Sequence, residues 1–326
     1  MTTSSSAPDL TALVERAAAG QARAIGRLIS LIEGGGPDMR PLAALLAPYT
    51  GRAQIIGLTG PPGVGKSTTT SALVGALRAN GERVGVLAVD PSSPFTGGAL
   101  LGDRIRMQTH ALDRDVFIRS MATRGNLGGL AAAVPQAVRV LDAARCDVVL
   151  IETVGVGQSE VDIVRQADTT LVLSAPGMGD GIQAVKAGIL EIASIFVVNK
   201  SDQPGADLVV RDLRQMQSLG GRHSAAGSWR PPIVQTVAEE GANGRGVAEL
   251  VAAIYKHRDR LITSGELEQR RAERGRSEIE AVALQSLHFG LAERTTGDPL
   301  GDLGQRVARG ELDAYTAADA LLNVLR

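Results

Sequence analysis

The sequence Gly60-Pro61-Pro62-Gly63-Val64-Gly65-Lys66-Ser67-Thr68 contains a complete phosphate-binding loop of the pattern Gly-x-x-x-x-Gly-Lys-Ser. Glycines in such a loop let backbone N–H groups turn inward around phosphate oxygens. Lys66 is expected to reach the β- and γ-phosphates, and the Ser67 hydroxyl is expected to bind Mg²⁺. The apolar residues 54–59 before the loop predict a strand, and a helical pattern after it ends at Asn80-Gly81. Strand, loop and helix together predict a nucleoside-triphosphate site.

A second motif, Asn199-Lys200-Ser201-Asp202, follows the apolar run 195–198. Such a run is typical of a buried parallel strand, whose carboxyl end is where ligands bind in α/β sheets. There the Asp202 carboxylate can accept hydrogen bonds from the ring N–H and the exocyclic amine of guanine, a donor pair that adenine lacks. Lys200 can lie along the base, while Asn199 braces the neighbouring loops. A last base-contacting loop is expected at Thr236, Val237 and Ala238.

Composition limits the class of protein. With 326 residues and a formal net charge of −1, the chain can form one α/β domain with helical additions, and it has no basic block for nucleic acid or membranes. The aromatic content of 2% argues against a base-stacking platform. A single cysteine and four isolated histidines exclude a disulfide scaffold and a clustered metal site. Because no signal segment or long apolar run is visible, we expect a cytoplasmic protein.

Seven apolar runs, separated mostly by helical stretches, predict a mostly parallel, doubly wound α/β sheet of the P-loop NTPase class. The runs lie near 54–59, 83–89, 116–120, 147–152, 169–174, 195–198 and 233–236. Helical patterns precede them, and a charged helix with one apolar stripe begins at Glu266. That stripe either folds back on the core or pairs with a second copy, and pairing is favoured. Thr316 and Asp319 have the spacing of a helix capping box.

The turn residues between these patterns divide the chain into three predicted parts. We expect an N-terminal helical extension over residues 1–50, a nucleotide-binding domain over 51–262, and a C-terminal helical arm over 263–326.

The fourth strand is followed by residues that should face the γ-phosphate. Glu152 and Gly155 have the spacing of the Asp-x-x-Gly pattern of GTPases, in which the acid supports Mg²⁺ and the glycine N–H meets the γ-phosphate. The residue after the glycine is Val156, so the glutamine that orients water in Ras-like enzymes is absent here. We therefore expect slow intrinsic hydrolysis.

Two more carboxylates, Asp90 and Asp103, lie on loops expected beside the phosphate loop, where they suit Mg²⁺–water ligation and water activation. Arg106 or Arg124 can supply positive charge to the transition state, or can equally be a solvated surface residue. A glycine-rich loop at Pro176–Gly188 enters a further helix. By themselves its polar residues can be read as exposed side chains on a connecting helix.

The motifs together resemble the MeaB/ArgK family, the GTPases that accompany adenosylcobalamin-dependent methylmalonyl-CoA mutase. The resemblance is carried by Ala88-Val-Asp-Pro-Ser-Ser93, Leu101-Gly-Asp-Arg104, Arg124-Gly-x-Leu-Gly-Gly129, Glu152-Thr-Val-Gly-Val-Gly-Gln-Ser-Glu160, Gly179-Asp180, Gln183-x-x-Lys186 and Asn199-Lys-x-Asp202. It implies a G domain related to signal-recognition and metal-insertion GTPases (the SIMIBI class), with homodimerisation through the C-terminal helices.

The resemblance also implies a function. GTP binding and hydrolysis would gate delivery of intact cofactor to the mutase and its protection or reactivation. Phosphate, Mg²⁺ and hydrolysis would be served by Lys66, Ser67, Asp90, Asp103 and Glu152. The nucleotide state would be relayed to the mutase by Asp180, Gln183 and Lys186. Here Gly181 replaces an acidic residue that many members carry in this switch. The alternatives are a nickel-insertion GTPase and, following an older family label, a kinase of an amino-acid transport system.

Overall fold

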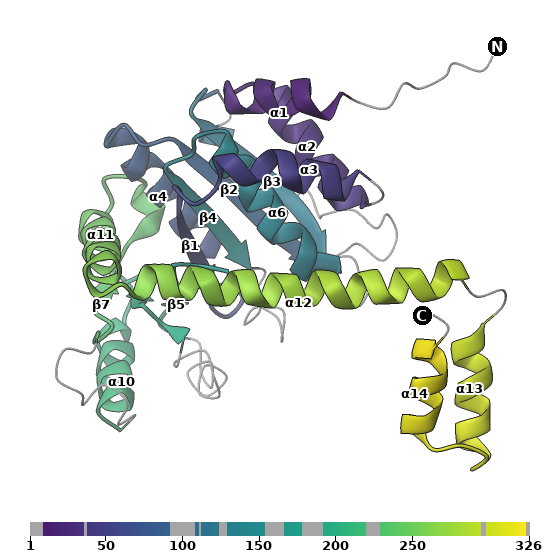
Figure 1. Ribbon diagram of the computed structural model, residues 1–326. Coiled ribbons are helices and arrows are strands. Elements are labelled where there is room, and N and C mark those ends of the chain that lie inside the picture. The colour runs from purple at the N-terminus through teal and green to yellow at the C-terminus, as the bar shows by residue number, and fades with distance from the viewer. Residues whose placement is uncertain are drawn as a thin grey trace. The chain divides into compact units, whose positions relative to one another are not determined.

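The computed structural model consists of two units, one ending at Ala272 and one beginning at Glu273 (Figure 1). It describes residues 9–35, 38–91, 108–110, 112–123, 129–153, 166–177, 192–219, 229–294 and 298–323. None of the helices in these ranges is long and apolar enough to cross a membrane.

A single parallel sheet organises the first unit. Within the described residues it has seven strands in the order β3-β2-β4-β1-β5-β6-β7, which confirms the predicted doubly wound α/β fold. The strands are β1 (Gln54–Thr59), β2 (Val84–Pro91), β3 (Val116–Thr123), β4 (Val148–Thr153), β5 (Thr169–Ser174), β6 (Ile195–Val198) and β7 (Ile233–Gln235). Because all pairings are parallel, every strand presents its carboxyl end at the same edge of the sheet.

The central strands are apolar on both faces. In β4, Val148 and Leu150 belong to one buried cluster, whereas Val149 and Ile151 belong to another. Successive strand side chains point to opposite faces, so a strand without polar alternation must be covered twice. Helices therefore pack on both sides of the sheet.

Different helices cover the two faces (Figure 1). One apolar cluster joins the sheet to α1, α2, α3 and α6, and the opposite cluster joins it to α4 and α11, while α10 packs beside β6. The helices of this unit are α1 (Leu10–Ala18), α2 (Ala22–Gly34), α3 (Met39–Leu46), α4 (Lys66–Ala79), α6 (Gly129–Ala143), α10 (Ala206–Leu219) and α11 (Val247–Ser264), with short 3₁₀ turns at η1 (Ala47–Tyr49), η2 (Gln108–His110) and η4 (Ala238–Glu240).

The N-terminal helices share the core of the sheet. Leu28 and Ile29 of α2 are fully buried in the same apolar cluster as Met121 of β3. Arg119 of β3 also forms an ion pair of 2.6 Å with Glu33 of α2. The domain boundaries proposed from the sequence, after residues 50 and 262, remain predictions.

The helix α12 (Glu266–Arg294) begins in the first unit and continues into the second, which also contains α13 (Pro299–Ala308) and α14 (Ala314–Asn323). The helices α13 and α14 lie side by side as a hairpin (Figure 1). The predicted capping box at Thr316 and Asp319 is wrong. Asp313 Oδ1 accepts hydrogen bonds from the backbone N–H groups of Tyr315 and Thr316, so α14 begins earlier and Thr316 lies in its first turn.

Candidate nucleotide site

The predicted phosphate and guanine motifs meet at the carboxyl edge of the sheet. Gly60 directly follows β1, Glu152 lies near the end of β4, and Asn199 directly follows β6. Glu152 is in register with Leu58 of β1, which places it beside the start of the phosphate loop. Residues far apart in the sequence are thus brought together by parallel pairing alone.

Two glycines of the phosphate loop are sterically required. Gly60 has a φ of 148°, and a Cβ added there would lie 2.4 Å from the carbonyl oxygen of Leu173. Gly65 has a φ of 92°, and its Cβ would lie 2.4 Å from Asn199 Nδ2. Gly65 is also the N-cap of α4 and provides no side-chain cap to that helix. The N-terminal N–H groups of α4 are therefore without a side-chain cap at a position that favours an anion.

The Lys66 ammonium group lies within the loop that precedes it. Lys66 is buried, and its Nζ donates hydrogen bonds to the carbonyl oxygens of Gly60 at 2.7 Å and Pro61 at 3.1 Å. A buried cation next to a helix N-terminus makes this part of the site strongly attractive to phosphate.

Ser67 and Glu152 form the polar contact beneath the loop. The Ser67 hydroxyl donates to Glu152 Oε1 at 2.5 Å, and both side chains are buried. A hydroxyl and a carboxylate in contact are oxygen ligands of the kind that Mg²⁺ takes next to a bound phosphate. The fold therefore brings the phosphate loop into contact with the end of β4.

Asn199 connects three segments of the site. Its side-chain Nδ2 donates to the carbonyl oxygen of Val64 at 2.9 Å. Its Oδ1 accepts from Thr236 Oγ1 at 3.2 Å and from the backbone N–H of Ala238 at 3.1 Å. The side chain is buried, so these bonds are made away from water. Asn199 thus links the phosphate loop to the Thr236–Ala238 loop, and a role of that loop in base binding stays a prediction.

The other two motif residues lie at the surface of the same loop. Lys200 has a φ of 56°, unusual for a residue other than glycine, and its Nζ donates to the Gly63 carbonyl oxygen at 2.9 Å. The backbone N–H of Ser201 donates to the Thr236 carbonyl oxygen at 3.1 Å. Asp202 follows at an exposed position. Lys200 thus spans from this loop to the phosphate loop, and the Asp202 residue is exposed.

Part of the predicted site lies outside the described residues: Asp103, Arg106, Gly155, Asp180, Gln183 and Lys186. For Asp90 the backbone alone is described. It lies at the carboxyl end of β2, opposite Ala122 of β3, and so at the edge where Glu152 lies.

Two buried titratable groups lie away from this edge. Burial raises the pKa of the Cys146 thiol to about 12, which keeps it protonated. Burial also lowers the pKa of His257 to about 4, with a smaller contribution from Arg270. No group of three or more His, Cys, Asp or Glu side chains suited to a metal ion occurs among the described side chains.

The parallel sheet and the phosphate-loop geometry define a P-loop GTPase fold, and sequence comparison supplies the family. Residues 25–295 match the family described as methylmalonyl-CoA mutase-associated GTPase MeaB. This chain therefore belongs to the MeaB family, as the resemblance of its motifs predicts.

Several named relatives are similar over most of the chain. A Pyrococcus abyssi protein named as a GTPase is 47% identical, with 95% of each chain covered. The Escherichia coli GTPase ArgK is 35% identical over 84% of this chain and 85% of its own. The mouse mitochondrial methylmalonic aciduria type A homolog is 33% identical, covering 83% of this chain and 65% of the mouse protein.

A solved structure agrees with this assignment. The crystal structure of a protein named LAO/AO transport system kinase superposes with a TM-score of 0.70 at 26% identity and covers 96% of both chains.

Proposed function

We propose that this protein binds GTP and hydrolyses it to GDP and phosphate, and that it acts as a chaperone of an adenosylcobalamin-dependent acyl-CoA mutase, of the methylmalonyl-CoA type. The observation that carries the nucleotide part is the hydrogen bond between Asn199 and Val64, which ties a guanine-reading motif to a phosphate loop. In this proposal Asp202 reads the base, and Lys66 and the α4 N-terminus hold the phosphates.

Mg²⁺ fits the described residues as a cofactor. Ser67 and Glu152 offer a hydroxyl and a carboxylate oxygen in mutual contact at the phosphate loop. When bound, the ion would neutralise charge on the phosphate oxygens. We propose Ser67 and Glu152 as its holders, with Asp90 and Asp103 as further candidates.

Hydrolysis is proposed to be slow in the isolated protein. Val156 occupies the position where Ras-like enzymes carry a water-orienting glutamine. We propose Asp103 for water activation, Arg106 for transition-state charge and the Gly155 N–H for the γ-phosphate.

The mutase part of the proposal rests on the family. The family description names a methylmalonyl-CoA mutase, and the mouse relative is named for methylmalonic aciduria. We propose that Asp180, Gln183 and Lys186 relay nucleotide state to the mutase, in the cytoplasm.

A homodimer is proposed through the C-terminal arm. Ile279 and Leu284 of α12 are 72% and 62% exposed, which is unusual for large apolar side chains. A second copy covering them would explain this exposure. Replacing both residues with Glu should convert a dimer into a monomer in light-scattering measurements.

Nucleotide binding is tested by displacing a fluorescent GDP analogue from the purified protein. We expect GTP and GDP to displace it and ATP not to do so at the same concentration. Glu152→Gln should raise the Mg²⁺ concentration that half-maximal GTP hydrolysis requires. Equal displacement by ATP would contradict the proposed base recognition.

The chaperone role is tested by adding a cobalamin-dependent acyl-CoA mutase. We expect GTP turnover to rise, and we expect the double variant Gln183→Ala, Lys186→Ala to lose this rise while keeping its basal rate. Fast turnover that no such mutase changes would contradict the proposal. If basal turnover also falls in the double variant, these residues act in hydrolysis rather than in coupling.

A further inference from the structure

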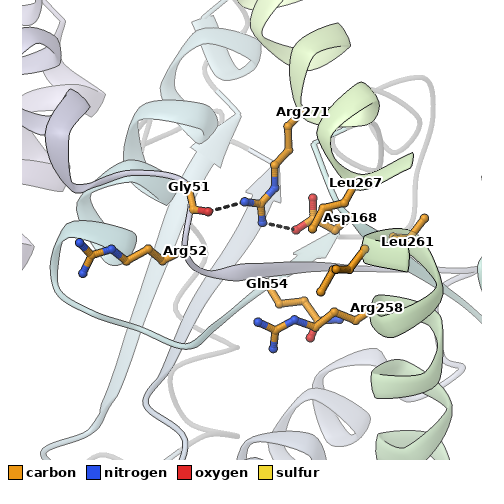
Figure 2. A pocket seen from close by; sticks show the side chains of 9 residues that line it. Gly51, Arg52, Gln54, Asp168, Arg258, Leu261, Leu267 and Arg271 are labelled. Atoms are coloured by element: carbon orange, nitrogen blue, oxygen red, sulfur yellow. Dashed lines mark hydrogen bonds and ion pairs between the residues drawn. The ribbon is translucent and has the colours of Figure 1, made fainter. Parts of the chain in front are cut away.

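A small pocket lies at the amino edge of the sheet, opposite the nucleotide site. It is bounded by the start of β1, the residue before β5, and the end of α11 with the start of α12, and its volume is about 170 Å³. Figure 2 shows Arg271 reaching between Gly51 and Asp168 in this pocket. Gln54, which lines it, begins β1, whereas Gly60 follows the other end of that strand. The pocket and the phosphate loop are therefore separate sites.

The framework of the pocket is fixed by Arg271. Its guanidinium donates to the carbonyl oxygens of Gly51 and Ala53, the latter at 2.9 Å, and pairs with Asp168 at 3.2 Å. The Asp168 carboxylate also accepts from the backbone N–H of Ile55 at 3.0 Å. These bonds occupy Asp168, the only acidic side chain among the described residues that line the pocket.

Two buried polar atoms of the lining have no hydrogen-bond partner among the described residues. They are Gln54 Oε1, an acceptor, and Arg271 Nε, a donor. The Gln54 residue is only 2% exposed, and its Nε2 makes a long bond of 3.4 Å to Thr169 Oγ1. A buried polar group without a partner is costly, so a bound molecule that pairs with Gln54 Oε1 would be stabilised.

The charge of the lining is positive. Arg258 and Arg271 face the pocket, whereas Arg52 lines its edge with its guanidinium directed away from Gln54 and Arg258 (Figure 2), and Asp168 is already paired with Arg271. Neither Arg52 nor Arg258 forms an ion pair within the described part of the chain. Arginine is the side chain best suited to bind a carboxylate through two parallel hydrogen bonds.

We propose that this pocket binds a small carboxylate that also carries a hydroxyl group. The carboxylate would pair with Arg258, and the hydroxyl would donate to Gln54 Oε1. The volume of about 170 Å³ is below the roughly 300–1,000 Å³ of sites for drug-sized ligands, so the ligand is of small-metabolite size. This site is independent of the proposed GTPase activity.

The test is a calorimetric titration of the full-length protein with malate, a dicarboxylate that carries one hydroxyl. We expect saturable binding with a Kd of about 1 mM or tighter. Succinate, which lacks the hydroxyl, should bind about tenfold more weakly because Gln54 Oε1 then stays unpaired. Arg258→Gln should weaken malate binding about tenfold or more, whereas Arg52→Gln should change it little. Lys256→Gln, an exposed change on the same helix, is the matched control and should have no effect.

The titration is repeated in the presence of GDP, which reveals any binding of malate at the phosphate loop by competition. Unchanged malate affinity supports a separate pocket. The proposal is overturned if malate shows no saturable binding, if GDP displaces it, if succinate binds equally well, or if Arg258→Gln binds malate like wild type.

Discussion

The side-chain amide of Asn199 lies 2.9 Å from the carbonyl oxygen of Val64, so the loop after β6 is bonded directly to the phosphate loop. The same side chain accepts hydrogen bonds from Thr236 and Ala238. One buried amide therefore sets the relative positions of three loops. In the proposed function this geometry holds the base-reading carboxylate at a fixed distance from the phosphates.

Asn199→Ala should damage both folding and binding. It leaves the Val64 carbonyl and the Ala238 N–H without a side-chain partner, and we expect a loss of about 2 kcal/mol in the free energy of unfolding without nucleotide. The affinity for GDP should fall at least about tenfold. Ser201→Ala is the matched control, because Ser201 Oγ is buried and has no partner within the described structure. Urea unfolding and GDP titration that cannot tell Asn199→Ala from Ser201→Ala would contradict this role.

Gly65→Ala should abolish nucleotide binding, because the added methyl group clashes with Asn199 and the backbone at this position is strained for any residue other than glycine. The added Cβ would lie 2.4 Å from Asn199 Nδ2, at a φ of 92°. Gly81→Ala is the control, since Gly81 has a φ of 83° and nothing within 4 Å of the added Cβ. The control should lose only about 1–2 kcal/mol of stability and keep its GDP affinity. Equal GDP affinity in the two variants would show that Gly65 has no steric role.

Much of the fold could be predicted from the sequence because its strands are continuous apolar runs bounded by turn residues. The run before Asn199 and the run before Glu152 both became strands close to the predicted bounds. The order of strands in the sheet could not be predicted, since Val- and Ile-rich runs are interchangeable as partners. The predicted N-terminal cap of α14 was wrong because Asp313 and Thr316 both have side chains that can cap a helix. In the structure Asp313 accepts the hydrogen bonds from the first N–H groups of α14.

The nucleotide motifs were visible in the sequence because each is contiguous. The pocket at the amino edge was not, because its residues come from four separated segments and match no motif. In the sequence, Gln54 looks like any other residue of a predicted strand. Arg271 is one of many charged residues on α12, and nothing in the sequence distinguishes it from the others. Only the folded chain shows that Arg271 reaches Asp168.

Arg271→Met should destabilise the first unit by about 3 kcal/mol, because it removes the ion pair between Arg271 and the buried Asp168 carboxylate. Arg211→Met is the control. Arg211 pairs with Asp212 at 3.6 Å and its side chain is 71% exposed, so its loss should cost less than about 1 kcal/mol. The fluorescence of Trp229, the single tryptophan of the chain, reports unfolding of this unit. Equal unfolding midpoints for the two variants would contradict the importance of the buried pair.

His257 should make the first unit less stable in mild acid. Burial lowers the pKa of His257 to about 4, below an unfolded value of about 6.5, so the unfolded state binds more protons between these values. Stability is therefore highest above pH 6.5 and falls as the pH drops toward 4, by about 2 kcal/mol between pH 7 and pH 5. The variant His257→Asn should lose less over the same interval. A pH dependence identical in the two proteins would rule out this buried imidazole as its source.

The most direct test of the proposed function is the base preference of Asp202→Asn, measured by nucleotide displacement with GTP and xanthosine triphosphate. Xanthine has a carbonyl where guanine has its exocyclic amine, so an Asn amide can donate to xanthine but repels guanine. We predict that the variant loses GTP affinity by about 100-fold or more and binds xanthosine triphosphate more tightly than GTP, with its fold unchanged. Wild-type affinity for GTP in this variant would contradict the proposal that Asp202 reads guanine.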